Sequence, residues 1–139
     1  MKRIIGCLIV GLLLASTVRA EEKAVAKDDS ASGGYVHVVI FTLKKDAPET
    51  AVDDVIKDCH KMLGKISSVR SVKAGRPSKD VAEKVVKTDY DVGLVVLVDD
   101  FAGIKTYLED PLHVEFVKKY GKHFEMKKLQ VFDFVDAKK

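Results

Sequence analysis

One segment, TYLEDPLHVEF, places a tyrosine and a histidine on either side of a helix break. Asp110 followed by Pro111 is a typical helix start, a capping residue and then the first helical position. His113 then falls in the first turn, where unpaired N–H groups disfavour an imidazolium. A neutral His113 can act as a general base, and Tyr107 can donate its hydroxyl to a carbonyl or enolate oxygen. We therefore take Tyr107 and His113 as a candidate catalytic pair for proton transfer on a carbonyl compound.

The same two residues also fit a structural role. Each lies on the apolar face of a predicted helix, where its one polar tip can be satisfied by the backbone. Two further residues are candidate ligand contacts. His37 lies in an otherwise apolar strand, where it either hydrogen-bonds within the protein or lines a pocket. Phe116 lies on the same face of its predicted helix as His113. A ligand-contacting group of His37, Tyr107, His113 and Phe116 is thus the alternative to simple core packing.

Other kinds of site are not indicated. The four histidines, His37, His60, His113 and His123, lack H-x-x-x-H spacing and no cysteine pair accompanies them, so we expect no metal. There is no glycine-rich phosphate loop, nucleophile elbow or basic patch with interleaved aromatics, so we expect no cofactor and no nucleic-acid partner. The lysines of the last third are partly balanced by Glu115, Glu125, Asp133 and Asp136, and most simply form a solvated face.

The first twenty residues are typical of a secretory signal peptide, with a basic start, a short apolar run and small residues before a cleavage point after Ala20. The apolar run is too short to favour a retained membrane span. Cleavage removes three of the 24 basic residues and none of the 21 acidic ones, so the mature chain is formally neutral. We expect an exported protein, periplasmic or extracellular, with no membrane insertion and residues 21–34 as a flexible linker.

The mature chain must be stabilised by an apolar core. Cys59 is its only cysteine, so no intramolecular disulfide can form. Cys59 lies on the buried stripe of a predicted helix and is expected to be a packed thiol, whereas His60, one residue on, is expected in solvent. A length of about 119 residues suits one domain, which we place at residues 35–136.

Hydrophobic periodicity predicts the elements that position these residues. We expect strands over 35–43, 69–75, 91–98 and 128–135, a loop over 76–89, and helices over 52–66, from 101, and from 111. The helix from 101 should bury Phe101, Ile104, Tyr107 and Leu108, and that from 111 should bury His113, Phe116, Val117 and Tyr120. In the last strand, Leu129 and Val131 share one face, and Phe132 and Phe134 the other.

This order of elements predicts an α+β fold of the ferredoxin-like type, in which helices cover one face of an antiparallel sheet. The first and third strands are apolar on both faces, yet the chain supplies helices for only one. An apolar sheet face left uncovered is an association surface. We therefore expect a homodimer that packs sheet against sheet.

Five segments in order, HVVIFTLK, SVKAGRP, YDVGLVVLVDD, YLEDPLHVEFV and VFDF, resemble the stress-responsive α/β-barrel family, also called the Dabb domain. The resemblance spans about residues 35–135 and implies a dimeric α/β barrel built from two ferredoxin-like subunits. One plant branch cyclises polyketide chains with a tyrosine and a histidine, which match Tyr107 and His113 here, with His37 facing the same cavity. A further polar position of that branch corresponds to Val92, which implies a less polar cavity.

Three functions stay open at this point. The leading hypothesis is an exported dimeric stress-response protein that binds a small apolar or aromatic molecule without catalysis. The second is a cyclase-like or lyase-like enzyme that performs proton transfer on a carbonyl substrate, with His113 as base and Tyr107 as oxyanion donor. The third is a structural stress protein whose assembly is its function and which has no ligand-sized pocket.

Overall fold

The computed structural model describes residues 34–80 and 83–137. The predicted signal peptide and nearly all of the predicted linker lie outside these residues. The elements follow one another as β1 (Tyr35–Phe41), α1 (Ala51–Lys61), β2 (Val69–Gly75), β3 (Val92–Val98), α2 (Phe101–Glu109), α3 (Pro111–Tyr120) and β4 (Gln130–Val135). Short 3-10 turns at Leu63–Lys65, Gly121–His123 and Met126–Lys128 complete this part of the chain.

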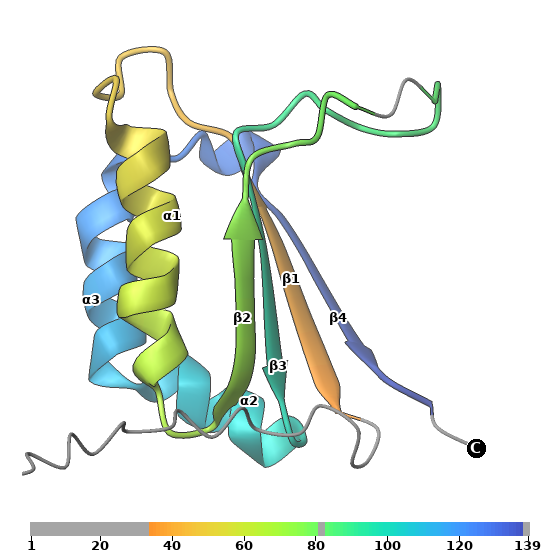
Figure 1. Cartoon of the computed structure of the whole chain (residues 1–139). Coiled ribbons are helices and arrows are strands. Elements are labelled where there is room, and N and C mark those ends of the chain that lie inside the picture. The colour runs from red at the N-terminus through yellow and green to blue at the C-terminus, as the bar shows by residue number, and fades with distance from the viewer. Residues whose placement is uncertain (1–33, 81–82, 138–139) are drawn as a thin grey trace, which may run out of the picture.

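The four strands form one antiparallel sheet in the order β2-β3-β1-β4. The helices lie on one side of this sheet, and the β2–β3 loop projects toward the other side (Figure 1). This arrangement confirms the predicted α+β ferredoxin-like fold. The predicted strand over 69–75 has the same limits as β2, and the predicted loop that follows carries no helix or strand among its described residues.

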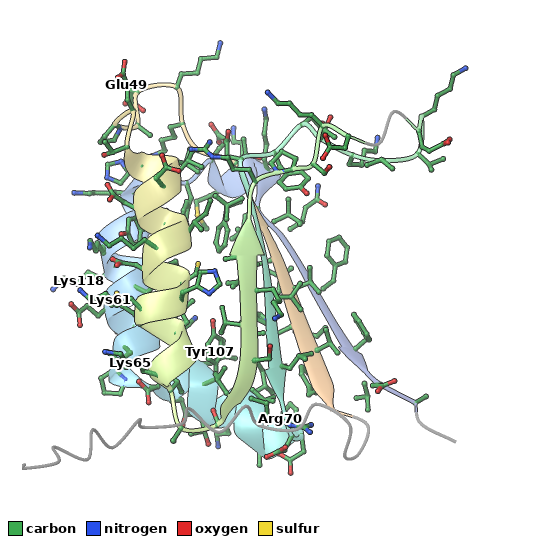
Figure 2. All side chains as sticks on the ribbon, viewed as in Figure 1. Glu49, Lys61, Lys65, Arg70, Tyr107 and Lys118 are labelled. Carbon is green, nitrogen blue, oxygen red and sulfur yellow. The ribbon has the colours of Figure 1, made fainter. Side chains whose placement is uncertain are left out.

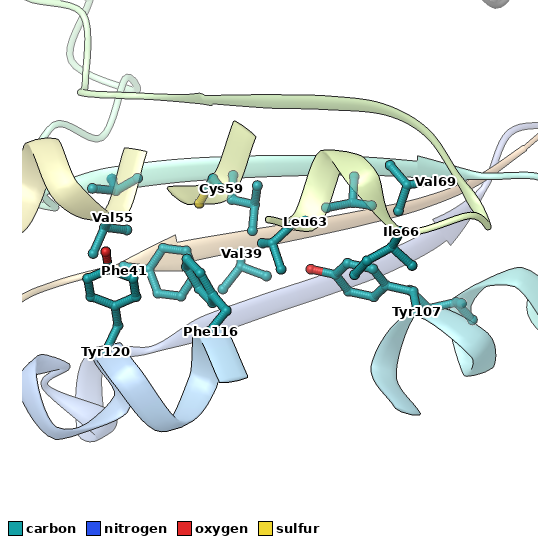
Figure 3. Packing of buried hydrophobic residues seen from close by; sticks show 14 of the residues in the cluster. Val39, Phe41, Val55, Cys59, Leu63, Ile66, Val69, Tyr107, Phe116 and Tyr120 are labelled. Carbon is teal, nitrogen blue, oxygen red and sulfur yellow. The ribbon is translucent and has the colours of Figure 1, made fainter. Parts of the chain in front are cut away.

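The core lies between the helices and the sheet. Strand residues at alternate positions face the helices, as Val39 and Leu94 do in the β1–β3 pair. Figure 3 shows Val55, Cys59 and Leu63 packed between helix and sheet. All three are fully buried, which confirms that Cys59 is a packed thiol, and burial raises its pKa to about 12. An unreactive thiol follows, because the thiolate is the reactive form.

The break between α2 and α3 is built as predicted. The Asp100 carboxylate accepts from Gly103 N–H at 2.8 Å and so caps α2. The Asp110 carboxylate accepts from Leu112 N–H at 2.8 Å and caps α3, whose first residue is Pro111. Such caps typically contribute about 1 kcal/mol each. They fix the angle at which two short helices reach the sheet.

The buried faces of these helices are narrower than predicted. Ile104 and Tyr107 are buried, but Phe101 is 72% exposed and Leu108 45% exposed. Phe101 lies at the first position of α2, where its ring reaches Tyr35 at the sheet margin, 6.5 Å away between centroids, instead of entering the core. Val117 of α3 is also half exposed, because its side chain borders a cavity.

Helices α1 and α3 are joined by a polar cluster at Asp58, which is buried. The Tyr120 hydroxyl donates to the Asp58 carboxylate at 2.7 Å, and Lys119 Nζ donates to the same oxygen at 2.7 Å. Burial acts to raise the pKa of Asp58, but the hydrogen bonds from Lys119 and Tyr120 together outweigh it, so this pKa is lowered. The carboxylate therefore stays ionised and holds the two helices together.

The sheet face opposite the helices is apolar and uncovered by any described part of the chain. Figure 2 shows side chains that project from this face without meeting a helix. Phe132 and Phe134 are 53% and 54% exposed, and strand alternation places them beside Val36 and Val38 of β1. This confirms the predicted division of β4 into two faces. Within the described residues, no helix is long and apolar enough to cross a membrane.

Candidate functional site

A cavity of about 350 Å³ lies between the sheet and helices α2 and α3. All four residues that the sequence singled out, His37, Tyr107, His113 and Phe116, line it. They come from β1, α2 and α3, so the fold brings together side chains that are far apart in the chain. The volume is at the lower end of the range for small-molecule sites.

His113 is held by the helix break that the sequence predicted. Its Nδ1 lies 3.0 Å from the carbonyl oxygen of Leu108. Because a carbonyl only accepts, Nδ1 carries the proton and Nε2 keeps its lone pair. Burial lowers the pKa of His113 and outweighs the hydrogen bond to Leu108, which acts to raise it. The structure thus presents a neutral imidazole at the cavity, as a general base requires.

Tyr107 is 1% exposed, and Figure 3 shows its hydroxyl directed inward between helix and sheet. Burial raises the pKa of this phenol well above its ordinary value, so it remains a hydrogen-bond donor. Its hydroxyl forms no hydrogen bond to the described residues. Tyr120, also buried, instead donates to Asp58. Buried hydroxyls normally have partners. The Tyr107 oxygen is not among the fully buried unpaired atoms of the described residues, because it borders the cavity.

His37 is fixed by the carboxylate of Asp133, a contact that the sequence did not predict. Its Nδ1 lies 2.7 Å from Asp133 Oδ1 on the neighbouring strand β4. The sequence placed Asp133 among the acidic residues that balance the lysines, and the structure adds a specific partner, His37, while the Asp133 side chain stays 41% exposed. Asp133 faces the helices because the β1–β4 register pairs it directly with His37. A carboxylate on Nδ1 favours the tautomer in which Nε2 is the acceptor.

The three rings form one cluster. The Tyr107 ring lies 5.7 Å from that of His37 and 4.7 Å from that of His113, measured between centroids. A phenol donor thus lies between two imidazoles, each anchored through Nδ1. Such a group can hydrogen-bond a carbonyl or hydroxyl oxygen of a ligand and can exchange a proton with it. The polar residues gather on this part of the lining, together with Asp133.

The rest of the cavity is apolar. The rings of Phe41 and Phe124 stack with their centroids 4.6 Å apart. Phe116 adds aromatic surface to the lining, and Val131 adds aliphatic surface. Gly121 borders the same space, and a Cβ added there would meet no atom within 4 Å. Val92, where the resemblance suggested a polar position, is fully buried in the core. The cavity therefore combines one polar group of side chains with an apolar remainder.

The other candidates lie away from this cavity. His60 is exposed on α1, as predicted. Among residues 34–80 and 83–137, no group of three or more potential metal ligands comes together.

The pairing that sequence reasoning missed, Asp133 with His37, had one indication in the sequence. Asp133 shares its alternating face with Val131, so a charged residue occupied a position expected to face the helices.

Comparison with known proteins identifies relatives of this chain. The family model described as the stress responsive A/B barrel domain, Dabb, matches residues 36–136. No curated protein matches the sequence. A solved Dabb family protein with a ferredoxin-like fold, from Mesorhizobium loti, is 27% identical over 77% of this chain and 100% of its own, with a TM-score of 0.60.

Two further solved structures share the fold at lower identity. A dimeric ferredoxin-like protein of unknown function from Thermobifida fusca is 18% identical, covering 74% of this chain and 91% of its own, with a TM-score of 0.61. A hydroxynitrile lyase from Passiflora edulis is 16% identical, covering 76% and 95%, with a TM-score of 0.63. At these identities, the likeness shows the fold alone.

Proposed function

The chain belongs to the stress responsive A/B barrel (Dabb) family, and we propose that it forms a homodimer that binds a small apolar or aromatic molecule between helices and sheet. We propose further, from the signal-peptide pattern of residues 1–20, that the protein is exported. The observation that carries the ligand proposal is the Tyr107 hydroxyl, which borders the cavity without a partner in the described chain. A ligand oxygen at this position would satisfy it. The stacked pair Phe41 and Phe124 offers the matching apolar surface.

The homodimer is proposed from the uncovered sheet face. Phe132 and Phe134, each about half exposed, lie on this face beside apolar residues of β1. Contiguous apolar surface of this kind marks an interaction site. The solved relative from Thermobifida fusca is described as dimeric. Face-to-face packing of two copies would bury the apolar side chains of both in one isologous interface.

A second candidate function, proton-transfer catalysis, is favoured by the state of His113. Its anchored Nδ1 and lowered pKa leave a neutral imidazole beside a phenol donor. In this reading, His113 Nε2 takes a proton from carbon next to a carbonyl, and Tyr107 stabilises the oxygen on which negative charge develops. The solved relative from Passiflora edulis is an enzyme, a hydroxynitrile lyase.

One substitution separates binding from catalysis. His113→Gln retains a hydrogen-bonding side chain but removes the base. With a panel of small aromatic carbonyl compounds, we expect saturable binding by calorimetry, with affinity within about tenfold in the variant. Loss of turnover with retained binding would establish the catalytic function. Failure of the whole panel to bind the wild-type protein would contradict the ligand proposal and favour the purely structural role.

A further inference from the structure

A second cavity, of about 440 Å³, lies at the end of the sheet where β1 finishes. It shares no lining residue with the helix–sheet cavity. The loop that leads into β3 and the turns that precede β4 lie at this same end of the sheet (Figure 1). The polar part of its lining consists of Thr42, Lys87, Asp89, Lys127, Lys128 and Gln130. Ile40 and Tyr90 supply the apolar part.

The two walls of this cavity are both fastened to the end of β1. On one side, the Asp91 carboxylate accepts from Leu43 N–H at 2.7 Å. On the other, Glu125 N–H donates to the carbonyl oxygen of Thr42 at 2.8 Å. These bonds bring Tyr90, next to Asp91, close to the turn that carries Lys127 and Lys128. The cavity is therefore a product of the fold, because hydrogen bonds to two adjacent residues just after β1 hold both walls.

The charge of the lining is strongly biased. Three lysines, Lys87, Lys127 and Lys128, line the cavity together with a single acidic residue, Asp89. Within the described part of the chain, none of these lysines forms an ion pair or a side-chain hydrogen bond. Three like charges around one space repel one another. A bound anion would relieve this repulsion, and the formal excess of two positive charges matches a dianion.

Tyr90 gives the site an apolar wall. Its ring lies over Gly93, with Tyr90 Cε2 3.6 Å from the point that a Cβ would occupy, and Ile40 Cδ1 is 3.8 Å from the same point. The absence of a side chain on Gly93 thus leaves room for the ring to lie against the sheet. Ile40 and Tyr90 together form a surface suited to an aromatic or acyl group.

We propose that this cavity binds a small organic dianion, a phosphate monoester with an apolar group. The ammonium groups of Lys87, Lys127 and Lys128 hold the phosphate oxygens, and Ile40 and the Tyr90 ring contact the apolar part. Charge-assisted hydrogen bonds to phosphate are among the stronger polar contacts in proteins. This site is independent of the helix–sheet cavity and of the ligand proposed there. Ile40 pairs with Gln130 on the open sheet face, next to the pair Val38 and Phe132. The site therefore lies at the end of the proposed dimer interface and requires that the second copy leave this end of the sheet open.

The test titrates phenyl phosphate into the full-length protein by isothermal calorimetry at pH 7.5. We expect one site per chain, a loss of about tenfold in affinity for the double substitution Lys127→Gln and Lys128→Gln, and weakening by salt. Lys65→Gln is the matched control, because Lys65 is an exposed lysine in the turn after α1, away from this cavity (Figure 2). Circular dichroism confirms that each variant is folded.

Three outcomes would overturn the proposal. The first is no saturation by about 10 mM phenyl phosphate, which would show that the cavity does not bind this probe. The second is an equal loss of affinity in Lys65→Gln, which would show non-specific attraction to surface lysines. The third is equal affinity for inorganic phosphate, which would remove the role given to Ile40 and Tyr90. Each outcome leaves the ligand proposal for the helix–sheet cavity untouched.

Discussion

The Tyr107 hydroxyl provides the sharpest test of the helix–sheet site, through Tyr107→Phe. This change removes one oxygen from a ring that is 1% exposed, and the ring itself stays in place. The hydroxyl has no hydrogen-bond partner in the described chain. The hydroxyl oxygen is not among the fully buried unpaired atoms of the described residues, because it borders the cavity. A fully buried hydroxyl without a partner costs about 1–3 kcal/mol, and the Tyr107 hydroxyl carries only a part of that cost. We therefore expect the free energy of unfolding to stay constant or to rise by up to about 1 kcal/mol.

Tyr120→Phe is the matched control, because it removes the same atom from another buried tyrosine. The Tyr120 hydroxyl donates to the Asp58 carboxylate at 2.7 Å. A hydrogen bond to a charged group contributes about 1.5–3 kcal/mol. Since Asp58 keeps its contact with Lys119, we expect the lower end of that range, a loss of about 1.5 kcal/mol. The free energies of unfolding of the two variants should thus differ from each other by about 1.5–2.5 kcal/mol, with Tyr120→Phe the less stable.

Urea unfolding followed by circular dichroism measures this difference, since the chain has no tryptophan to report by fluorescence. With a slope of about 1–1.5 kcal/mol per molar urea, the Tyr120→Phe midpoint should fall by about 1 M. The Tyr107→Phe midpoint should not fall. If Tyr107→Phe were as destabilising as Tyr120→Phe, the hydroxyl would have a partner within the protein. The argument for a ligand oxygen beside Tyr107 would then fail.

Three further predictions concern other residues. Since burial lowers the pKa of His113, the folded protein binds fewer protons than the unfolded chain below about pH 6.5. Stability should thus decrease as pH falls through the folded pKa, and urea midpoints at pH 7 and pH 5 should differ less in His113→Gln. Gly121→Leu should change the free energy of unfolding by less than about 0.5 kcal/mol, because a Cβ there meets no atom within 4 Å. The same variant should weaken ligand binding by more than about tenfold in calorimetry. Phe134→Asp should convert the dimer to a folded monomer in sedimentation velocity, whereas an unchanged dimer would exclude the open sheet face as the interface.

Local sequence patterns were sufficient to predict most of the fold. Period-two alternation placed the two faces of β4, and the pair Asp110 and Pro111 placed the break between α2 and α3. These features depend on neighbouring residues alone, so they can be read without knowledge of tertiary contacts. His37, Tyr107, His113 and Phe116 were singled out for the same reason, as polar or aromatic residues in apolar stripes, and they line one cavity.

The parts that failed depend on contacts between distant segments. Asp133 lies 96 residues from its partner His37, and only the β1–β4 register shows that the two are paired. Phe101 is apolar and helical, but as the first residue of α2 it stays 72% exposed and contacts only the ring of Tyr35 among the aromatic rings described. The free hydroxyl of Tyr107 is likewise invisible in the sequence, since Tyr120 on a similar stripe finds Asp58. Register and hydrogen-bond partners must come from the structure.

The central claim, a ligand beside Tyr107, is tested most directly by native mass spectrometry of the protein purified from its own host. We predict a dimer that carries a defined extra mass, which is released on denaturation. The Gly121→Leu variant, prepared in the same way, should form the same dimer without that mass, because Gly121 lines the cavity and open space surrounds a Cβ added there. An extra mass retained in full by Gly121→Leu would place the ligand elsewhere and contradict the account.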